Sequence, residues 1–252
     1  MTCRMRYAPM ALLSLAMAPI GARVQAQDPK PRAAEFTGDL GLVNAAGNSN
    51  VTSINLGDKL VLRSGDSRHV FTQVFGLVYG RSEGETIANN WRGSGRYELG
   101  LSKRVSLYGL VAAERNRFAG ILRRFEEGPG LIVTLVSTAR NMLSVEVGAS
   151  MVQQRSTDGV DDSFASGRSA LLFQHQFSEK AKFGQALEFL PNLEQLDDYR
   201  INSESSLVAP ISSSIAIKVA YVIRFDNTPL VTATQTFKKT DRLLTSGIQI
   251  TL

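Results

Sequence analysis

The chain has 252 residues, of which 43% are hydrophobic and 20% are charged. This balance excludes a disordered polar chain and a bundle of membrane-spanning helices, and the length fits one large domain or two small ones. The formal charge of +5, from 28 Lys and Arg against 23 Asp and Glu, would by itself suggest a nucleic-acid partner.

Residues 1–26 have the features of a secretory signal peptide. Arg4 and Arg6 form a positive start, residues 8–20 are apolar, and small residues precede a cleavage site near Ala26. A short buried helix is the alternative interpretation, but the prolines and glycine of this segment disfavour it. We therefore predict an exported protein whose leader is removed near Ala26.

Cleavage at this point changes the charge and the cysteine content. The leader carries three of the 28 basic residues and no acidic one, so the mature chain has 25 against 23, a net charge of +2. Composition then no longer suggests a nucleic-acid partner. The single cysteine, Cys3, leaves with the leader, so the mature chain has no thiol for a disulfide or a thiolate metal site.

After a short polar linker at residues 27–35, hydrophobicity alternates with a period of two as far as residue 252. In residues 215–226, for example, Ile, Val, Tyr and Phe occupy one face and smaller or charged residues the other, as in a strand. We expect a barrel domain over 36–252, with strands near 35–45, 51–63, 68–80, 89–101, 104–115, 124–136, 142–154, 164–177, 182–193, 199–210, 214–226 and 241–252.

The connections between these strands differ in length on the two sides. Short polar turns are expected at 64–67, 102–103, 137–140, 178–180 and 212–214, and longer loops at 81–88, 115–123, 155–163 and 226–240. This layout is typical of outer-membrane barrels. We predict an all-β fold, a transmembrane antiparallel up-and-down β-barrel of about twelve strands, with a secreted soluble β-sandwich binding protein as the alternative.

The last strand has the alternation that outer-membrane assembly machinery recognises. Leu244, Ile248, Ile250 and Leu252 share one face, with Ser246 as the exception. Outer-membrane lipid and the assembly machinery are therefore expected partners, the latter through this strand.

Four stretches carry a resemblance to a known family. They are residues 47–50 (GNSN) leading into 52–57 (TSINLG), 83–86 (EGET), 108–110 (YGL) with 114–121 (ERNRFAGI), and 197–200 (DDYR). The chain resembles the YdiY-type salt-induced outer membrane proteins, a bacterial family of unknown biochemical function. The resemblance implies an outer-membrane barrel and carries no catalytic or ligand site.

Two residues depart from the expected strand pattern. Asp58 falls on an apolar face, where a bulge would turn it inward or the membrane interface would accommodate it. Pro129 cannot donate a ladder hydrogen bond, so we expect a bulge or the start of the sixth strand there.

Alternation places ten charged side chains in the barrel lumen, five basic and five acidic. They would either line a narrow polar pore or form ion pairs that occlude it, and both remain open. The ten are Arg92, Arg96, Glu98, Glu114, Glu146, Arg168, Glu188, Glu204, Lys218 and Arg224.

A basic cluster near the second long connection, at 115–123, is a candidate for contact with lipopolysaccharide phosphates. Ordinary pairing with Glu126, Glu127 or loop acids is the alternative interpretation. The acidic residues of 155–163 do not match a calcium loop, so no metal and no cofactor is predicted. The basic cluster consists of Arg115, Arg117, Arg123 and Arg124.

The sequence offers little for catalysis. His69 and His175 are the only histidines, and no serine lies in a Gly-x-Ser-x-Gly elbow. We expect a non-enzymatic outer-membrane barrel, either a narrow pore or an envelope-integrity protein, with a barrel hydrolase as the alternative.

Overall fold

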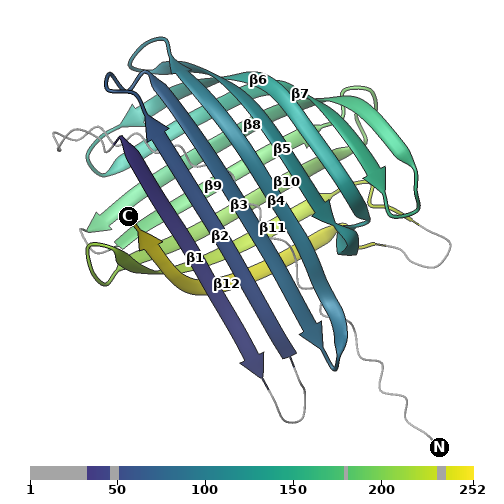
Figure 1. The fold of residues 1–252 in the computed structure, drawn as a ribbon. Helices are drawn as coiled ribbons and strands as arrows, with labels where there is room; N and C mark the ends of the chain where they lie inside the picture. Colours follow the sequence, from purple (N-terminus) through teal and green to yellow (C-terminus); the bar gives the residue numbers. More distant parts are fainter. Residues whose placement is uncertain (1–32, 46–50, 179–180, 232–236) are drawn as a thin grey trace, which may run out of the picture.

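The computed structural model describes residues 33–45, 51–178, 181–231 and 237–252 (Figure 1). The predicted signal peptide lies outside this part. Within it are twelve strands and the short 3-10 helix η1 (Arg117–Ala119). The strands are β1 (Ala34–Ala45), β2 (Val51–Arg63), β3 (His69–Ser82), β4 (Glu85–Gly100), β5 (Val105–Asn116), β6 (Ile121–Ser137), β7 (Asn141–Ser156), β8 (Asp161–Ser178), β9 (Ala181–Pro191), β10 (Tyr199–Pro210), β11 (Ile215–Asp226) and β12 (Thr240–Thr251).

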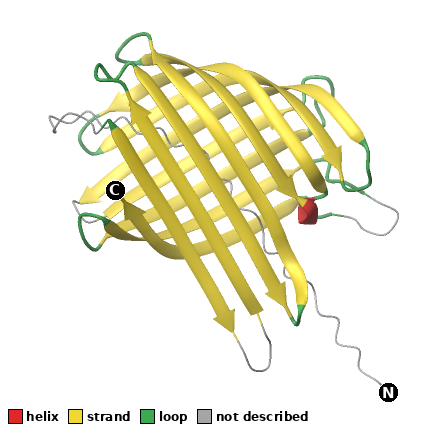
Figure 2. Ribbon diagram, viewed as in Figure 1, coloured by secondary structure: helices red, strands yellow, loops and turns green. Residues whose placement is uncertain are grey.

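Each strand pairs antiparallel with its neighbours in the chain, and β1 pairs with β12 to close a barrel (Figure 2). The prediction of a twelve-stranded up-and-down barrel is confirmed, and the closed ladder excludes a two-sheet sandwich. Among the described residues, no helix is long and apolar enough to cross a membrane.

Burial alternates along the strands and separates a lumen face from an outer face. In β3, Val70, Thr72 and Val74 are buried, whereas Phe71 between them is exposed. The outer faces of the other strands are mostly apolar, which gives the barrel a coat suited to lipid.

Aromatic residues gather near both ends of this coat, as at the two interfaces of a membrane. The group near the short turns contains Tyr97 and Phe173, and the group near the opposite end contains Phe189, Tyr199 and Phe225. The coat and its two girdles fit an outer-membrane location.

Three of the expected long loops are instead mostly strand. β3 and β4 join through a two-residue turn of Glu83 and Gly84, both at positive φ (51° and 86°), which matches the twist of a tight hairpin. Strand structure likewise extends into 115–123 and 155–163. The expectation of long loops is wrong at these three places, because polar residues at a barrel rim belong to strands as well as to loops.

The ladder registers exclude a bulge at either irregular residue, Pro129 or Asp58. Pro129 lies inside β6 without a change of register. It lies opposite Gly109 of β5. On the other side, the β6–β7 ladder has pairs at Glu127 and at Gly130 and keeps the same register between them. No bulge turns Asp58 inward, because β2 keeps one register with both neighbours, and this side chain shares the outer face with Leu56 and Leu62.

Candidate functional site

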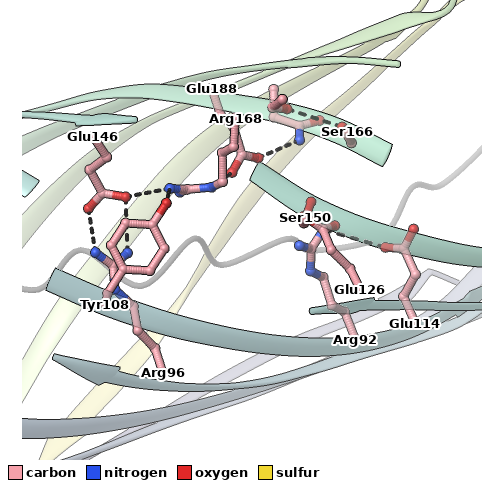
Figure 3. A network of polar contacts seen from close by, with 12 residues as sticks. Arg92, Arg96, Tyr108, Glu114, Glu126, Glu146, Ser150, Ser166, Arg168 and Glu188 are labelled. Carbon is pink, nitrogen blue, oxygen red and sulfur yellow. Dashed lines mark hydrogen bonds and ion pairs between the residues drawn. The ribbon is translucent and has the colours of Figure 1, made fainter. Parts of the chain in front are cut away.

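The lumen charges of β4, β7 and β8 meet in a buried network (Figure 3). Arg96 of β4 donates from Nη1 and Nη2 to the two carboxylate oxygens of Glu146 of β7, at 3.0 and 2.8 Å. Their side chains are only 1% and 2% exposed. This bidentate geometry is the strongest form of an arginine–carboxylate pair.

Arg168 of β8 extends the network to the next strand. It donates from Nη1 to Glu146 and from Nε to Glu188 of β9, the latter at 2.8 Å. Glu188 also accepts a hydrogen bond from Asn202 of β10 at 2.8 Å. Basic and acidic groups thus alternate from β4 to β9, so each buried charge has an opposite neighbour and its desolvation is compensated.

Tyr108 of β5 fixes the two arginines in place. Its hydroxyl accepts a hydrogen bond from Arg168 Nη1 at 2.9 Å, and its ring lies 4.0 Å from the guanidinium carbon of Arg96. Such stacking is a cation–π interaction.

A pair of glycines makes room for this ring. Gly130 of β6 lies opposite Tyr108 and also opposite Gly148 of β7, which in turn lies opposite Arg168. A Cβ atom on Gly130 would overlap the Tyr108 ring, and one on Gly148 would come within 2.7 Å of its hydroxyl. The tyrosine therefore lies flat across β6 and β7 and reaches β8.

A second cluster lies nearer the long-loop end. Glu114 of β5 accepts from Arg124 Nη1 at 2.6 Å and from Arg92 Nη1 at 3.5 Å. Arg124 also donates from Nε to Gln154 at 2.7 Å, and Ser150 donates to Glu126 at 2.9 Å.

Apolar side chains of β3 and β4 meet those of β11 and β12 across the lumen. Val78 of β3 and Ala88 of β4 form a buried cluster with Val222 of β11 and Leu243 of β12. β1 and β2 separate these strand pairs in the barrel, so the cluster spans the lumen rather than lying within one wall.

Toward the short turns the lumen widens into a cavity of about 330 Å³, here called the vestibule. It is bounded partly by the turn at 212–214. Its lining includes three lysines and three carboxylates: Lys59, Lys182, Lys218, Glu35, Asp39 and Glu204. Lys218 Nζ lies 3.2 Å from Asp39 Oδ2.

The structure places all ten predicted lumen charges on inward, buried or half-buried positions. Six are buried (Arg96, Glu98, Glu114, Glu146, Arg168 and Glu204) and four are half-buried (Arg92, Glu188, Lys218 and Arg224). That they line a conducting path stays a prediction. Sequence reasoning missed Tyr108 and Asp39, although strand alternation alone would have placed both beside charged lumen residues.

Three of the four arginines of the predicted lipopolysaccharide cluster, Arg115, Arg123 and Arg124, line one cavity near the long-loop end, and their contact with lipopolysaccharide stays a prediction. Arg124 points into the lumen, Arg115 lies beside Trp91 on the outer face, and Arg117 and Arg123 are exposed at the rim. Arg123 is 71% exposed and lies 3.7 Å from Asp161.

Both histidines face outward near the short turns. His69 contacts the Tyr97 hydroxyl at 2.6 Å, and His175 contacts Asn141 at 2.7 Å and packs against Phe177. Within the described ranges, no group of three metal-ligating residues is found.

The profile of one protein family, described as "Protein of unknown function, DUF481", matches residues 38–251. This is the family of the YdiY-type proteins, so the predicted resemblance is confirmed. No match is found among curated proteins.

Several solved structures are similar. The NanC porin is 9% identical, with a TM-score of 0.47 over 86% of this chain and 97% of that one. The translocator domain of autotransporter NalP from Neisseria meningitidis is 11% identical, with a TM-score of 0.47 over 86% of each chain. The KdgM porin is 11% identical, with a TM-score of 0.45 over 86% and 98%.

Proposed function

Because the chain belongs to the DUF481 family of proteins of unknown function, we propose a role from its geometry: a non-enzymatic outer-membrane barrel whose lumen is sealed at rest. The observation that carries this proposal is the network of Arg96, Glu146 and Arg168, whose side chains are at most 5% exposed. A water-filled pore would leave such groups solvated.

The apolar cluster of Val78, Ala88, Val222 and Leu243 supports the same conclusion for the other half of the lumen. Together the two closures leave the vestibule open toward the short turns only. A sealed barrel of this kind would act in envelope integrity rather than in free diffusion.

A narrow pore is the second candidate, and the vestibule favours it. A cavity of about 330 Å³ that mixes lysines and carboxylates would receive small polar solutes if the network opened. In that case the ion pairs would act as the gate.

The surroundings of the two histidines support a non-enzymatic role. His69 pairs with a tyrosine and His175 with an asparagine, both among aromatic rings at the outer surface. Tyrosine in such a position serves as an interface anchor, and histidine likewise combines an apolar ring with a polar tip. Of the four arginines in the predicted basic cluster, Arg117 and Arg123 are the two whose exposure supports contact with lipopolysaccharide phosphates.

Planar-bilayer recording tests the sealed lumen. The wild-type protein is expected to give no current steps, whereas Glu146→Ala leaves two buried arginines without their shared carboxylate and should produce fluctuating steps. Glu204→Ala removes another inward carboxylate outside the network and is the matched control. Regular wild-type steps that Glu146→Ala does not alter would contradict the proposal. A heat-modifiable gel shift verifies folding of each variant.

A further inference from the structure

The ladder between β1 and β12 is much shorter than the ladders on either side of it. It pairs Thr37 with Thr251 and ends at Leu40 with Ile248, within strands described over Ala34–Ala45 and Thr240–Thr251. By contrast, β1 pairs with β2 along its whole length, and β12 pairs with β11 from Thr240 to Ile250. In Figure 1, β12 curves away from β1 toward the long-loop end.

Unpaired strand edges are unfavourable in hydrocarbon, because lipid offers no partner for backbone N–H and C=O groups. Such backbone is tolerated in membranes where it lines a polar opening or is covered by protein. The separated halves of β1 and β12 therefore require one of these two solutions.

A small cavity lies in the wall where the ladder ends. Outward residues Leu40, Leu56 and Ser246 line it together with inward residues Asn55 and Thr245. Its volume of about 30 Å³ is room for a water molecule or two.

Glycines keep this point free of side chains. Gly41 and Gly247 face each other one position beyond the last ladder pair, and Gly57 lines the same cavity. A Cβ atom on Gly247 would come within 2.5 Å of the Leu40 carbonyl oxygen. The two strands therefore touch here through backbone alone, and further separation exposes no buried side-chain packing between them.

The chemistry of the opening is that of an amphiphile site. On its inner side, Asp39 Oδ1 and Asn55 Oδ1 are buried acceptors without a hydrogen-bond partner among the described residues. On the outer side, Leu40 and Leu42 are 45% and 66% exposed. Unpartnered acceptors call for donors, and Lys218 beside Asp39 disfavours a cationic donor, which favours neutral donors such as hydroxyl groups.

We propose that the β1–β12 seam is a lateral portal for a single-chain amphiphile with a neutral, hydroxyl-rich head. The chain stays in the bilayer while the head enters between Gly41 and Gly247 and hydrogen-bonds to Asp39 and Asn55. Asp39 and Lys218 line both the portal and the vestibule, so their ion pair stands between the two. This route avoids the central network, and the portal goes beyond the proposed function. A conducting lumen would therefore neither support nor contradict the portal.

Photolabelling of the wild-type protein in phosphatidylcholine vesicles tests the portal. The probe is an alkyl glucoside with a diazirine on the sugar, and adducts are located by mass spectrometry. Adducts on the lumen-facing Asn55 and Thr245 are expected. Adducts confined to outward residues such as Leu56 would overturn the proposal, and so would equal labelling of the lumen positions by an alkyl trimethylammonium probe of the same chain length.

A reversible lock provides the matched comparison. Leu42 and Ser246 would face each other if the ladder continued, so a disulfide in Leu42→Cys/Ser246→Cys, made without residues 1–26, should abolish lumen labelling, and reductant should restore it. The control is Ile217→Cys/Ile248→Cys, which joins an intact ladder pair and should change nothing.

Labelling that persists in the oxidised Leu42→Cys/Ser246→Cys protein would overturn the portal. A disulfide between two copies of Leu42→Cys, together with absent lumen labelling in the wild type, would assign the seam to strand pairing between copies instead. Wild-type labelling decides the proposal even if the lock fails to form.

Discussion

The position of the Tyr108 ring depends on two glycines, Gly130 and Gly148. Its ring occupies the space over Gly130 and Gly148 and reaches from β5 to Arg168 of β8. We predict that Gly130→Ala displaces the ring and lowers the free energy of unfolding by about 1–3 kcal/mol, the usual cost of overpacking. Urea titration of the folded protein in vesicles measures this change.

Gly109 supplies the control for this substitution. It neighbours Tyr108 in β5, yet a Cβ atom there meets nothing within 4 Å. Gly109→Ala should therefore leave stability nearly unchanged, and equal effects of the two substitutions would refute the role given to the glycine pair.

Asp58 is an acidic residue on the lipid-facing side of β2. Because a carboxylate in hydrocarbon is unfavourable, Asp58→Leu should stabilise the barrel in vesicles by about 1 kcal/mol. Asp162→Leu, on an exposed position near the long-loop end, should have little effect. A loss of stability in Asp58→Leu would show that this carboxylate makes a favourable contact instead.

Alternation in the sequence was sufficient to place the ten lumen charges, but not to pair them. Arg96 and Glu146 are fifty positions apart and lie on strands separated by two others. Their contact depends on how far the two side chains extend across Tyr108 and the glycine pair. No local sequence pattern indicates this distance.

At the scale of elements, the sequence located every strand but misplaced several ends. The β3–β4 connection is a turn of Glu83 and Gly84 rather than a long loop. Polar residues at a barrel rim alternate as in any strand, but this alternation is recognisable only when the strand register is known. Composition alone therefore favours a loop.

The tight turn between β3 and β4 requires a glycine at position 84. Gly84 has a φ of 86°, which a residue with a Cβ atom rarely adopts. Gly84→Ala should cost about 1 kcal/mol of unfolding free energy, because nothing crowds the site and only backbone strain acts. Gly65→Ala, in an uncrowded turn without a strained φ, should cost less, and chemical denaturation compares the two.

At the scale of the whole molecule, period-two alternation and turn spacing predicted a closed barrel of twelve strands. They could not decide whether the lumen is open, since the same inward charges serve a pore or a plug. The short β1–β12 ladder was also beyond prediction, because alternation in the two strands continues past the point where they separate.

The proposed function requires a lumen that is closed between the vestibule and the long-loop end. Gln176 lines the vestibule and is half-buried, so Gln176→Cys gives a reporter on that side of the closure. The exposed Asp162→Cys is the control for access from outside.

The most direct test is labelling of these two variants, both without Cys3, in intact cells with a maleimide too large for general porins. We predict that external reagent labels Asp162→Cys and not Gln176→Cys, and that Gln176→Cys reacts only after the outer membrane is opened. Prompt labelling of Gln176→Cys in intact cells would contradict a sealed lumen.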